Sequence, residues 1–357
     1  MARALRHKEA AIRPLADIAV VEAYAPGVNL ALRLAGAMAG RIAADCGARV
    51  IVLQGDDDPM REIPPFVGKT SAIDAFLNRG KQIVPARDAT QHLDAADVAV
   101  MDASAARQLR QRPPIVAALS MFKGDTEGPA SEFTVMALGG LLDLVGDPAR
   151  APLKLGGHQA AYAAGLAAYT GIAAALCRPR VGGNIPAETV QVSMLDTVIW
   201  LNWKSVSVPP GQPALTRIGS AAEWQVVRCR DGFVALVYQE PDWTALCDIV
   251  DDARLRAPQF AQRTERIRCA REIAAIVEQC FLTLTRRAIH ELALARRIPL
   301  GPIWSPREVA ADPQTTARGA LETAMVDGRN ITMPRLPVLW NGQPLGARPA
   351  LAEAAAS

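Results

Sequence analysis

An alternation of short apolar runs with an alanine-rich stretch constrains the fold of this 357-residue chain more than any other feature. Residues 17–22 and 49–54 are runs typical of buried parallel strands. Residues 30–46, between them, carry apolar side chains at helical spacing, and Gly47 ends this stretch. A strand, a helix and a strand within about forty residues predict a βαβ unit with a right-handed crossover.

Two more apolar runs extend the alternation, at residues 97–101 and 114–120. The pattern favours an α/β fold whose core is a doubly wound parallel sheet. Ligands of such sheets bind beyond the carboxyl ends of the strands. We therefore expect the site near the loops that follow Val21, Leu53 and Leu119.

Two common phosphate-binding motifs are missing from the sequence. Neither GxGxxG nor GxxxxGK(S/T) occurs, so a nicotinamide or ATP-type phosphate cradle is not supported. Gly36 and Gly40 do have GxxxG spacing. In a helix of a globular protein this spacing favours close packing against a neighbouring element, and we interpret it in that way.

The rest of the chain completes the large domain and predicts a separate, smaller one. In the large domain, residues 132–145 and 160–176 predict helices, and 188–192 predict a strand. The composition changes near 209–213, and a β-hairpin over 225–229 and 232–238 follows. Further helices are expected over 241–251, 264–282 and 285–297. The predicted segments are a large domain over 1–208, a small α+β domain over 214–320, and a return to the large domain over 325–357.

Composition and charge exclude several classes of protein. There are 39 basic and 36 acidic residues, a net charge of +3 that does not indicate binding to nucleic acid. The six cysteines form no CxxC pair, and no Cys/His run has metal-ligand spacing, so no metal is expected. The start of the chain lacks the apolar core of a signal peptide, and no segment is apolar enough to span a membrane. We expect a cytoplasmic protein.

A series of short motifs gives a family resemblance. Residues 77–81 read Leu-Asn-Arg-Gly-Lys, and 191–195 read Gln-Val-Ser-Met-Leu. Further matching segments, in order, are 34–36, 44–50, 96–98, 128–129, 138–141, 146–148, 231–232, 242–243, 301–303, 312–314 and 317–319. Together they resemble the class III CoA-transferases (the CaiB/BaiF family), which include formyl-CoA:oxalate and carnitine CoA-transferases and α-methylacyl-CoA racemase. The resemblance covers roughly residues 15–345.

The resemblance implies a fold, a cofactor and an assembly. The large domain is expected to be Rossmann-like, and two chains are expected to interlock as a homodimer. Coenzyme A is expected as part of an acyl-CoA substrate, with a small carboxylic acid as its partner. Arg49, Asn78, Arg79 and Lys81 match family positions near the nucleotide, where cationic and amide donors suit phosphate groups.

The family's catalytic position is where the sequence departs. In the transferases an aspartate of a GxPxxDxxxG pattern attacks the thioester. Here residues 156–165 match this pattern, and Ala161 stands in the aspartate position. A branch of the family reads GGHQAEY, with a glutamate, and even this glutamate is missing. His158 and Tyr162 flank the position, and either could serve as an acid/base group or donate to a thioester carbonyl, although lining the pocket is the simpler interpretation.

Other residues offer little replacement for the missing acid/base groups. The racemases use a second acid/base histidine, and its position here falls near Ser131. Asp125 and Glu127 are the nearest loop carboxylates, and Glu240 is a further candidate in the small domain. The sequence therefore offers no obvious pair of acid/base residues for two-base racemisation.

Two classes of function stay open. The chain transfers CoA between an acyl-CoA and a carboxylic acid, or it works on a CoA thioester by an altered mechanism of lyase, isomerase or hydratase type. Alternatively it is a catalytically silent subunit of a heteromer whose partner is a catalytic homologue, or a CoA-ester-binding regulatory protein. A further alternative is an inactive protein that traps its ligand because the carboxylate was removed by engineering. Fold alone does not decide between them, because function belongs to the site.

Overall fold

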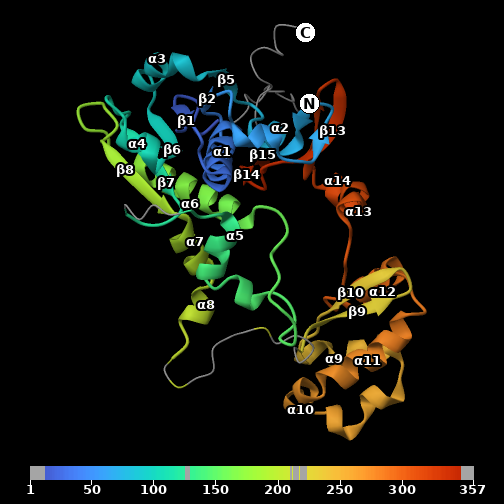
Figure 1. The fold of residues 1–357 in the computed structure, drawn as a ribbon. Helices are drawn as coiled ribbons and strands as arrows, with labels where there is room; N and C mark the ends of the chain where they lie inside the picture. Colours follow the sequence, from blue (N-terminus) through green and yellow to red (C-terminus); the bar gives the residue numbers. More distant parts are fainter. Residues whose placement is uncertain (1–12, 125–128, 210, 212–216, 218–222, 347–357) are drawn as a thin grey trace, which may run out of the picture. The chain divides into compact units, whose positions relative to one another are not determined.

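The computed structural model describes residues 13–124, 129–209, 211, 217 and 223–346 (Figure 1). The chain divides into two compact units. The large unit comprises 1–143, 154–215 and 314–357, and the small unit comprises 144–153 and 216–313. The segments expected from the sequence were 1–208, 214–320 and 325–357. Each unit has a hydrophobic core of its own.

A six-stranded parallel sheet forms the centre of the large unit. Its strands are β1 (Ala19–Ala23), β2 (Arg49–Gln54), β5 (Gln82–Pro85), β6 (Val98–Asp102), β7 (Ile115–Ser120) and β8 (Glu188–Ser193). Their spatial order is β5-β2-β1-β6-β7-β8, and every neighbouring pair is parallel. The order reverses between β1 and β6, so the loops after these two strands diverge and leave a crevice at the carboxyl edge.

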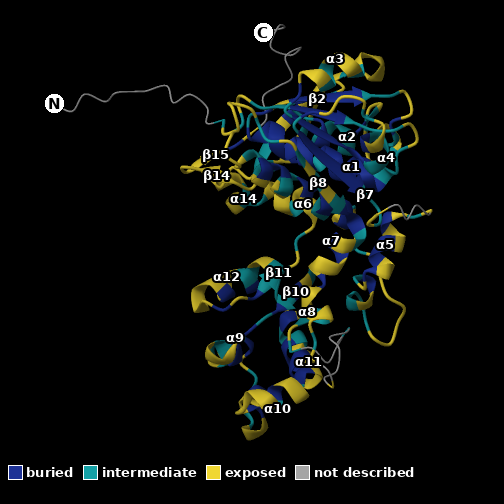
Figure 2. Ribbon diagram, turned by 90° about the vertical axis from the view of Figure 1, so that its left-hand side faces the viewer, coloured by how far each residue is buried: buried dark blue, intermediate teal, exposed yellow. Residues whose placement is uncertain are grey.

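Helices cover both faces of this sheet. On one face α1 (Leu30–Asp45) and α6 (Gln159–Leu176) pack on the strands and on each other. On the other face lie α3 (Ala89–Asp94) and α4 (Ala103–Arg107). Figure 2 shows α1 buried along nearly its whole length, whereas α3 is exposed on its outer side. The structure thus confirms the mixed α/β fold and its parallel sheet.

Close approach between α1 and β1 depends on two glycines. A Cβ atom on Gly36 would lie 2.0 Å from the Tyr24 hydroxyl, and one on Gly40 would lie 1.8 Å from Oε1 of Glu22. Both distances are far below van der Waals contact, so neither position accepts a side chain in this arrangement. The GxxxG spacing therefore serves close packing, as the sequence predicts.

The remaining elements of the large unit surround the sheet and its helices. They are β3 (Phe66–Val67), β4 (Thr70–Ser71), α2 (Ala72–Leu77), α5 (Glu132–Leu138), α7 (Met194–Leu201), α8 (Trp203–Val206), β12 (Leu321–Val326), β13 (Arg329–Pro334), β14 (Leu339–Trp340) and β15 (Gln343–Pro344). Within the described residues, no helix is both long enough and apolar enough to cross a membrane.

The helix expected over 132–145 is shorter than predicted. It ends at Leu138, because Gly139 packs tightly against Val198 and Gly140 adopts a left-handed φ of +77°. A 3₁₀ turn over Leu142–Leu144 follows. The Gly-Gly pair thus acts as the helix terminator.

The small unit is built on an antiparallel sheet. The predicted hairpin is present as β9 (Gln225–Cys229) and β10 (Gly232–Leu236), and β11 (Gly301–Pro302) adds a third strand. Its helices are α9 (Trp243–Val250), α10 (Arg263–Arg268), α11 (Ala270–Phe281), α12 (Arg286–Arg296) and α13 (Pro306–Ala311). Helix α14 (Pro313–Ala317) begins at the last residue of the small unit and continues in the large unit. The single helix expected over 264–282 is two helices that meet at Cys269.

Candidate functional site

Ala161, which the sequence resemblance places at the family's aspartate position, lies in the first turn of α6. Ala161 is the third residue of that helix, and its side chain is fully buried in the main core of the large unit. Backbone N–H groups in the first turn of a helix have no partner within the helix. At Ala160 and Ala161 these donors therefore need an acceptor from elsewhere.

Glu132 supplies that acceptor from a different element. It begins α5, and its Oε1 accepts hydrogen bonds from the amides of Ala160 (3.0 Å) and Ala161 (3.1 Å). Its Oε2 lies 2.8 Å from Nδ1 of His158. The carboxylate is buried, with 6% of the residue exposed. A negative charge is favourable at a helix N-terminus, so the fold places Glu132 where a carboxylate is stabilised.

His158 connects this carboxylate to the surface. It is the N-cap residue of α6, and 24% of its side chain is exposed. Its ring stands edge-on to that of Tyr162, with centroids 6.3 Å apart. Burial, and the negative charge of Glu132 to a lesser degree, raises the pKa of Tyr162 above its usual value. Tyr162 therefore remains a protonated hydrogen-bond donor near neutral pH.

The other carboxylates proposed from the sequence lie outside the described residues or in the small unit. Asp125 and Glu127 fall outside the described residues. Glu240 belongs to the small unit, where it forms an ion pair with Arg266. Ser131, which the sequence resemblance places near the racemase histidine position, caps α5 by accepting a hydrogen bond from the amide of Thr134. Glu132, by contrast, contacts the first turn of α6 directly.

A hollow of about 310 Å³ opens at the carboxyl edge of the sheet, where the strand order reverses. We call it the switch-point hollow. Its walls come from the loops after β1, β6 and β7. The lining residues are Ala25, Pro26, Gly27, Val28, Asn29, Leu32, Asp102, Ala103, Ser104, Arg107, Leu119, Ser120, Met121, Phe122, Gly124 and Ala130. The loops after β1 and β7 were expected there, but the loop after β2 does not contribute to the lining.

Two side chains hold the walls of the switch-point hollow together. Asp102 is buried and accepts hydrogen bonds from the amides of Ala25 (2.8 Å) and Ala105 (3.1 Å), which ties the β1 and β6 loops together. Asn29 donates from Nδ2 to the carbonyl of Ala130 at 2.7 Å. Ala130 is two residues before Glu132, the first residue of α5.

Arg107 is the cationic side chain of this lining. It is the last residue of α4 and is exposed to solvent. Sequence reasoning missed Glu132 and Arg107, because neither lies in a recognisable motif. A buried carboxylate at the start of one helix gives no local signal that it caps another helix.

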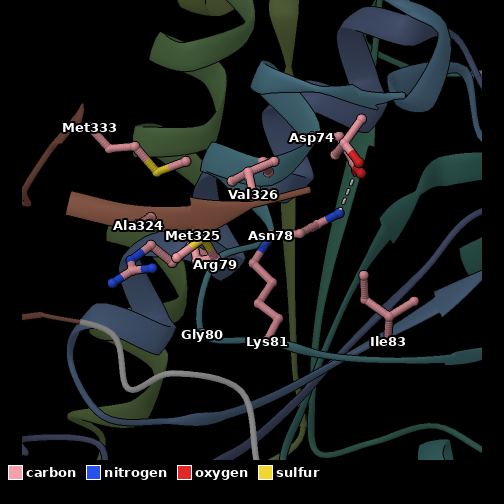
Figure 3. A pocket seen from close by; sticks show the side chains of 12 residues that line it. Asp74, Asn78, Arg79, Gly80, Lys81, Ile83, Ala324, Met325, Val326 and Met333 are labelled. Carbon is pink, nitrogen blue, oxygen red and sulfur yellow. Dashed lines mark hydrogen bonds between the residues drawn. The ribbon is translucent and has the colours of Figure 1, made fainter. Parts of the chain in front are cut away.

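Three of the four residues predicted to bind CoA line a different hollow, of about 280 Å³ (Figure 3). Asn78, Arg79 and Lys81 lie there, between the end of α2 and the β12–β13 hairpin. Asn78 donates to Asp74 at 2.8 Å, and Arg79 pairs with Glu322 at 3.0 Å.

Arg49 is exposed at the first residue of β2, the amino end of that strand. The structure therefore brings Asn78, Arg79 and Lys81 together and leaves Arg49 apart from them. None of the four lines the switch-point hollow.

Lys81 belongs to a cluster of buried charges under α1. Its Nζ contacts Oε1 of Glu22 at 2.5 Å and the Ala37 carbonyl at 2.8 Å, and its side chain is fully buried. Arg33 contacts the other oxygen of Glu22 at 3.2 Å and Asp58 at 3.1 Å. Each acid in this cluster is thus neutralised by a base from another element.

No group of three or more His, Cys, Asp or Glu side chains that could hold a metal ion occurs in the part of the chain that the structure describes. The side chains gathered at the start of α6 are those of Glu132, His158 and Tyr162.

The model of CoA-transferase family III matches residues 15–353. The chain belongs to this family. Among curated proteins, this family III chain is 28% identical over 380 residues to the succinate–glutarate CoA-transferase of Agrobacterium fabrum, covering 93% of the chain and 90% of the relative. It is 27% identical over 350 residues to the acetyl-CoA:oxalate CoA-transferase of Acetobacter aceti, covering 88% of each.

Solved structures agree with the fold of the family III chain. A CAIB/BAIF family protein from Brucella suis has a TM-score of 0.80 at 23% identity, with 94% of this chain and 96% of that chain covered. A protein described as hypothetical from Mycobacterium tuberculosis has a TM-score of 0.70 at 21% identity, with 95% and 96% covered. At these identities the likeness concerns the fold.

Proposed function

We propose that this family III protein binds a CoA thioester in the switch-point hollow and acts on it without a carboxylate at position 161. The observation that supports this most is the contact of Glu132 with the amides of Ala160 and Ala161. The carboxylate of Glu132 accepts hydrogen bonds from two amides in the first turn of α6, and it also contacts the partly exposed His158. A buried carboxylate that holds a histidine in place is an arrangement that enzymes use to orient an acid/base group.

The phosphate end of CoA fits the outer rim of the same hollow. Arg107, an exposed residue of the lining, supplies a cationic side chain there. Lys81 is a weaker candidate, because its ammonium is buried and already paired with Glu22. Arg49 and Arg79 reach the surface and stay predictions for nucleotide contacts.

The names of the relatives suggest the substrate class. They transfer CoA among short carboxylic acids: succinate and glutarate in one case, acetate and oxalate in another. We infer an acyl-CoA with a short acyl group as the substrate, with a small carboxylic acid as a possible acceptor.

We also infer that the chain works as a homodimer. Trp200, Leu201, Trp203 and Val206, on α7 and α8, are large apolar side chains that are exposed in the single chain, at 73%, 42%, 57% and 64%. A patch of this kind is typical of a protein interface. Light scattering of the purified protein measures the assembly directly. A mass of one chain would contradict a homodimer, and dimerisation only with a co-purifying homologue would favour a heteromer.

Incubation of the purified protein with a panel of short acyl-CoAs tests the proposal, with and without carboxylic acid acceptors. The CoA products and the intact protein mass are analysed together. Ala161→Asp and Ala161→Glu are run beside the wild type, each alone and combined with Glu132→Gln. The combination is included because Glu132 accepts hydrogen bonds from the amides at that position. The proposal requires turnover by the wild type.

Two outcomes would redirect the proposal. If the wild type binds acyl-CoA without turnover, and a carboxylate at position 161 restores transfer, then the chain is a silent subunit with an intact family site. If neither the wild type nor any variant binds CoA, the assignment of the switch-point hollow is wrong.

A further inference from the structure

We infer that Glu132 and His158 form a catalytic dyad that uses water as the acyl acceptor, so that the protein hydrolyses a CoA thioester. The inference rests on the proposed function, because it requires a CoA thioester bound beside α6. It names the reaction class and assigns each residue a part: His158 is the catalytic base, and Glu132 is the residue that positions it.

The hydrogen bonds of the carboxylate determine which group reacts. Glu132 already accepts three hydrogen bonds, two from amides at one oxygen and one from the imidazole at the other. It is also buried, and three donors reduce the negative charge available for attack. Glu132 is therefore suited to hold a partner in place and poorly suited to be a nucleophile.

The imidazole has the complementary arrangement. Because Nδ1 faces Glu132, the hydrogen atom lies on Nδ1 and Nε2 carries the free lone pair. The side chain is 24% exposed, and the proposal requires that Nε2 meets water there. A carboxylate that fixes the tautomer of a histidine base is the arrangement found in many hydrolases.

The proposed reaction balances with water as the co-reactant. Nε2 of His158 takes a proton from water, and the water oxygen forms a bond to the thioester carbonyl carbon. The tetrahedral intermediate collapses, the carbon–sulfur bond breaks, and the CoA sulfur takes the proton back from Nε2. The products are free CoA and a carboxylic acid that ionises in solution, and no redox change occurs.

Tyr162 can assist on the oxygen side of the thioester. Its hydroxyl stays protonated, because burial and the charge of Glu132 both disfavour the phenolate. A phenol beside the imidazole could donate to the carbonyl oxygen as negative charge develops on it, which is a common means of stabilising a transition state.

One base favours hydrolysis over the alternatives. Racemisation at the α-carbon needs proton carriers on two faces, and Ser131 stands where the second histidine would be. Transfer through a covalent anhydride needs a free carboxylate, and Glu132 is committed to its three donors. In hydrolysis a single histidine first accepts and then returns the proton.

The test follows release of the CoA thiol from short acyl-CoAs in water enriched in oxygen-18, without a carboxylic acid acceptor. We expect one heavy oxygen in the released acid and no label in the protein. We expect His158→Ala to reduce kcat by about 10²-fold or more, with partial recovery when imidazole is added. His92→Ala, which changes a histidine on α3 at the opposite face of the sheet, is the matched control and should leave the rate unchanged.

Glu132→Gln tests the positioning role separately. It keeps one acceptor for the amides of α6 but removes the charge that fixes the imidazole. We expect kcat to fall by about 10²-fold with little change in KM. If Glu132 had only a structural role, Glu132→Gln would instead lower the amount of folded protein, without a selective loss of kcat over KM.

Calorimetric binding of CoA distinguishes failure of this inference from failure of the proposed function. Heavy oxygen in Glu132 itself, or an acyl adduct on the protein, would mean that a carboxylate attacks and would overturn hydrolysis by the dyad. CoA binding with unchanged turnover in His158→Ala would overturn it as well. Absence of CoA binding would refute the proposed function instead.

Discussion

Two buried glutamates, Glu22 under α1 and Glu132 at the start of α5, show how differently one fold can use the same side chain. Glu22 is fully buried and is held by Lys81 and Arg33, two cations from other elements. Glu132 is held by two backbone amides and by a histidine that reaches the surface. The first arrangement fixes its charge, whereas the second connects a charge to a group that can exchange protons.

The two arrangements bear on how far a motif match assigns a role to a residue. The segment 77–81 matches the family closely, yet its lysine faces the interior and supports the packing of α1 on the sheet. The segment 156–165, where the sequence predicts a departure from the family pattern, carries the histidine that contacts Glu132. A residue that matches a family motif can thus be held in a buried ion pair.

The largest effect is expected from Lys81→Met. This change leaves the carboxylate of Glu22 buried with Arg33 as its remaining cation, and breaking a buried pair typically costs about 3–5 kcal/mol. Urea unfolding followed by circular dichroism measures the loss. If Lys81 acts only structurally, the folded fraction should still bind CoA with unchanged affinity.

Two variants control this measurement. Arg79→Met removes a partly exposed partner of Glu322, and a pair of that kind is worth about 1 kcal/mol or less. Combining Lys81→Met with Glu22→Gln removes both charges and should recover part of the lost stability. A loss for Lys81→Met no larger than that for Arg79→Met would contradict the structural role of the buried cluster.

A second carboxylate at the α6 site should have the next largest effect. Ala161→Asp places a carboxyl group in a fully buried position beside Glu132, and two carboxylates so close disfavour ionisation of both. We expect a loss of roughly 2–4 kcal/mol in the free energy of unfolding. Glu132→Gln in the same chain should recover part of it, as differential scanning calorimetry would show. Equal stability of Ala161→Asp and the wild type would mean that the family aspartate still fits.

Removing Glu132 altogether should cost less. Glu132→Ala takes the acceptor from the amides of Ala160 and Ala161, and a buried donor without a partner costs about 1–3 kcal/mol. Hydrogen exchange at these two amides is the direct measurement, and we expect faster exchange there than at the C-terminal end of α6. Unchanged exchange would show that the cap contributes nothing.

Most of the central sheet follows from the sequence, because apolar runs and the alanine-rich helix are local patterns. The strand expected over 49–54 has those bounds in the structure, and the helix expected over 30–46 ends one residue earlier, at Asp45. The prediction missed β5 and α2, which are short and carry weak periodicity. Helix ends set by packing, such as Leu138 before Gly139, also need the tertiary structure.

The candidate site was predictable only in part. His158 and Tyr162 were found because they flank a motif position, and the structure places both at the start of α6. Glu132 lies 26 residues before His158 and contacts it through tertiary packing alone. No spacing rule reaches that far, so the partner of the histidine could be recognised only in three dimensions.

The smallest effect concerns the pH dependence of the buried cluster. Burial lowers the pKa of Lys81 to about 8, although Glu22 opposes this shift, whereas an unfolded lysine has a pKa of about 10.4. Between these pH values the unfolded chain binds more protons than the folded chain, so the contribution of Lys81 to stability rises with pH. From about pH 7.5 to about pH 9.5 the wild type should gain roughly 1–2 kcal/mol relative to Lys81→Met, measured by urea unfolding at both values. A relative loss of stability over this range would mean that the pKa of Lys81 is raised in the folded state. Attraction to Glu22 would then outweigh burial and keep the lysine charged.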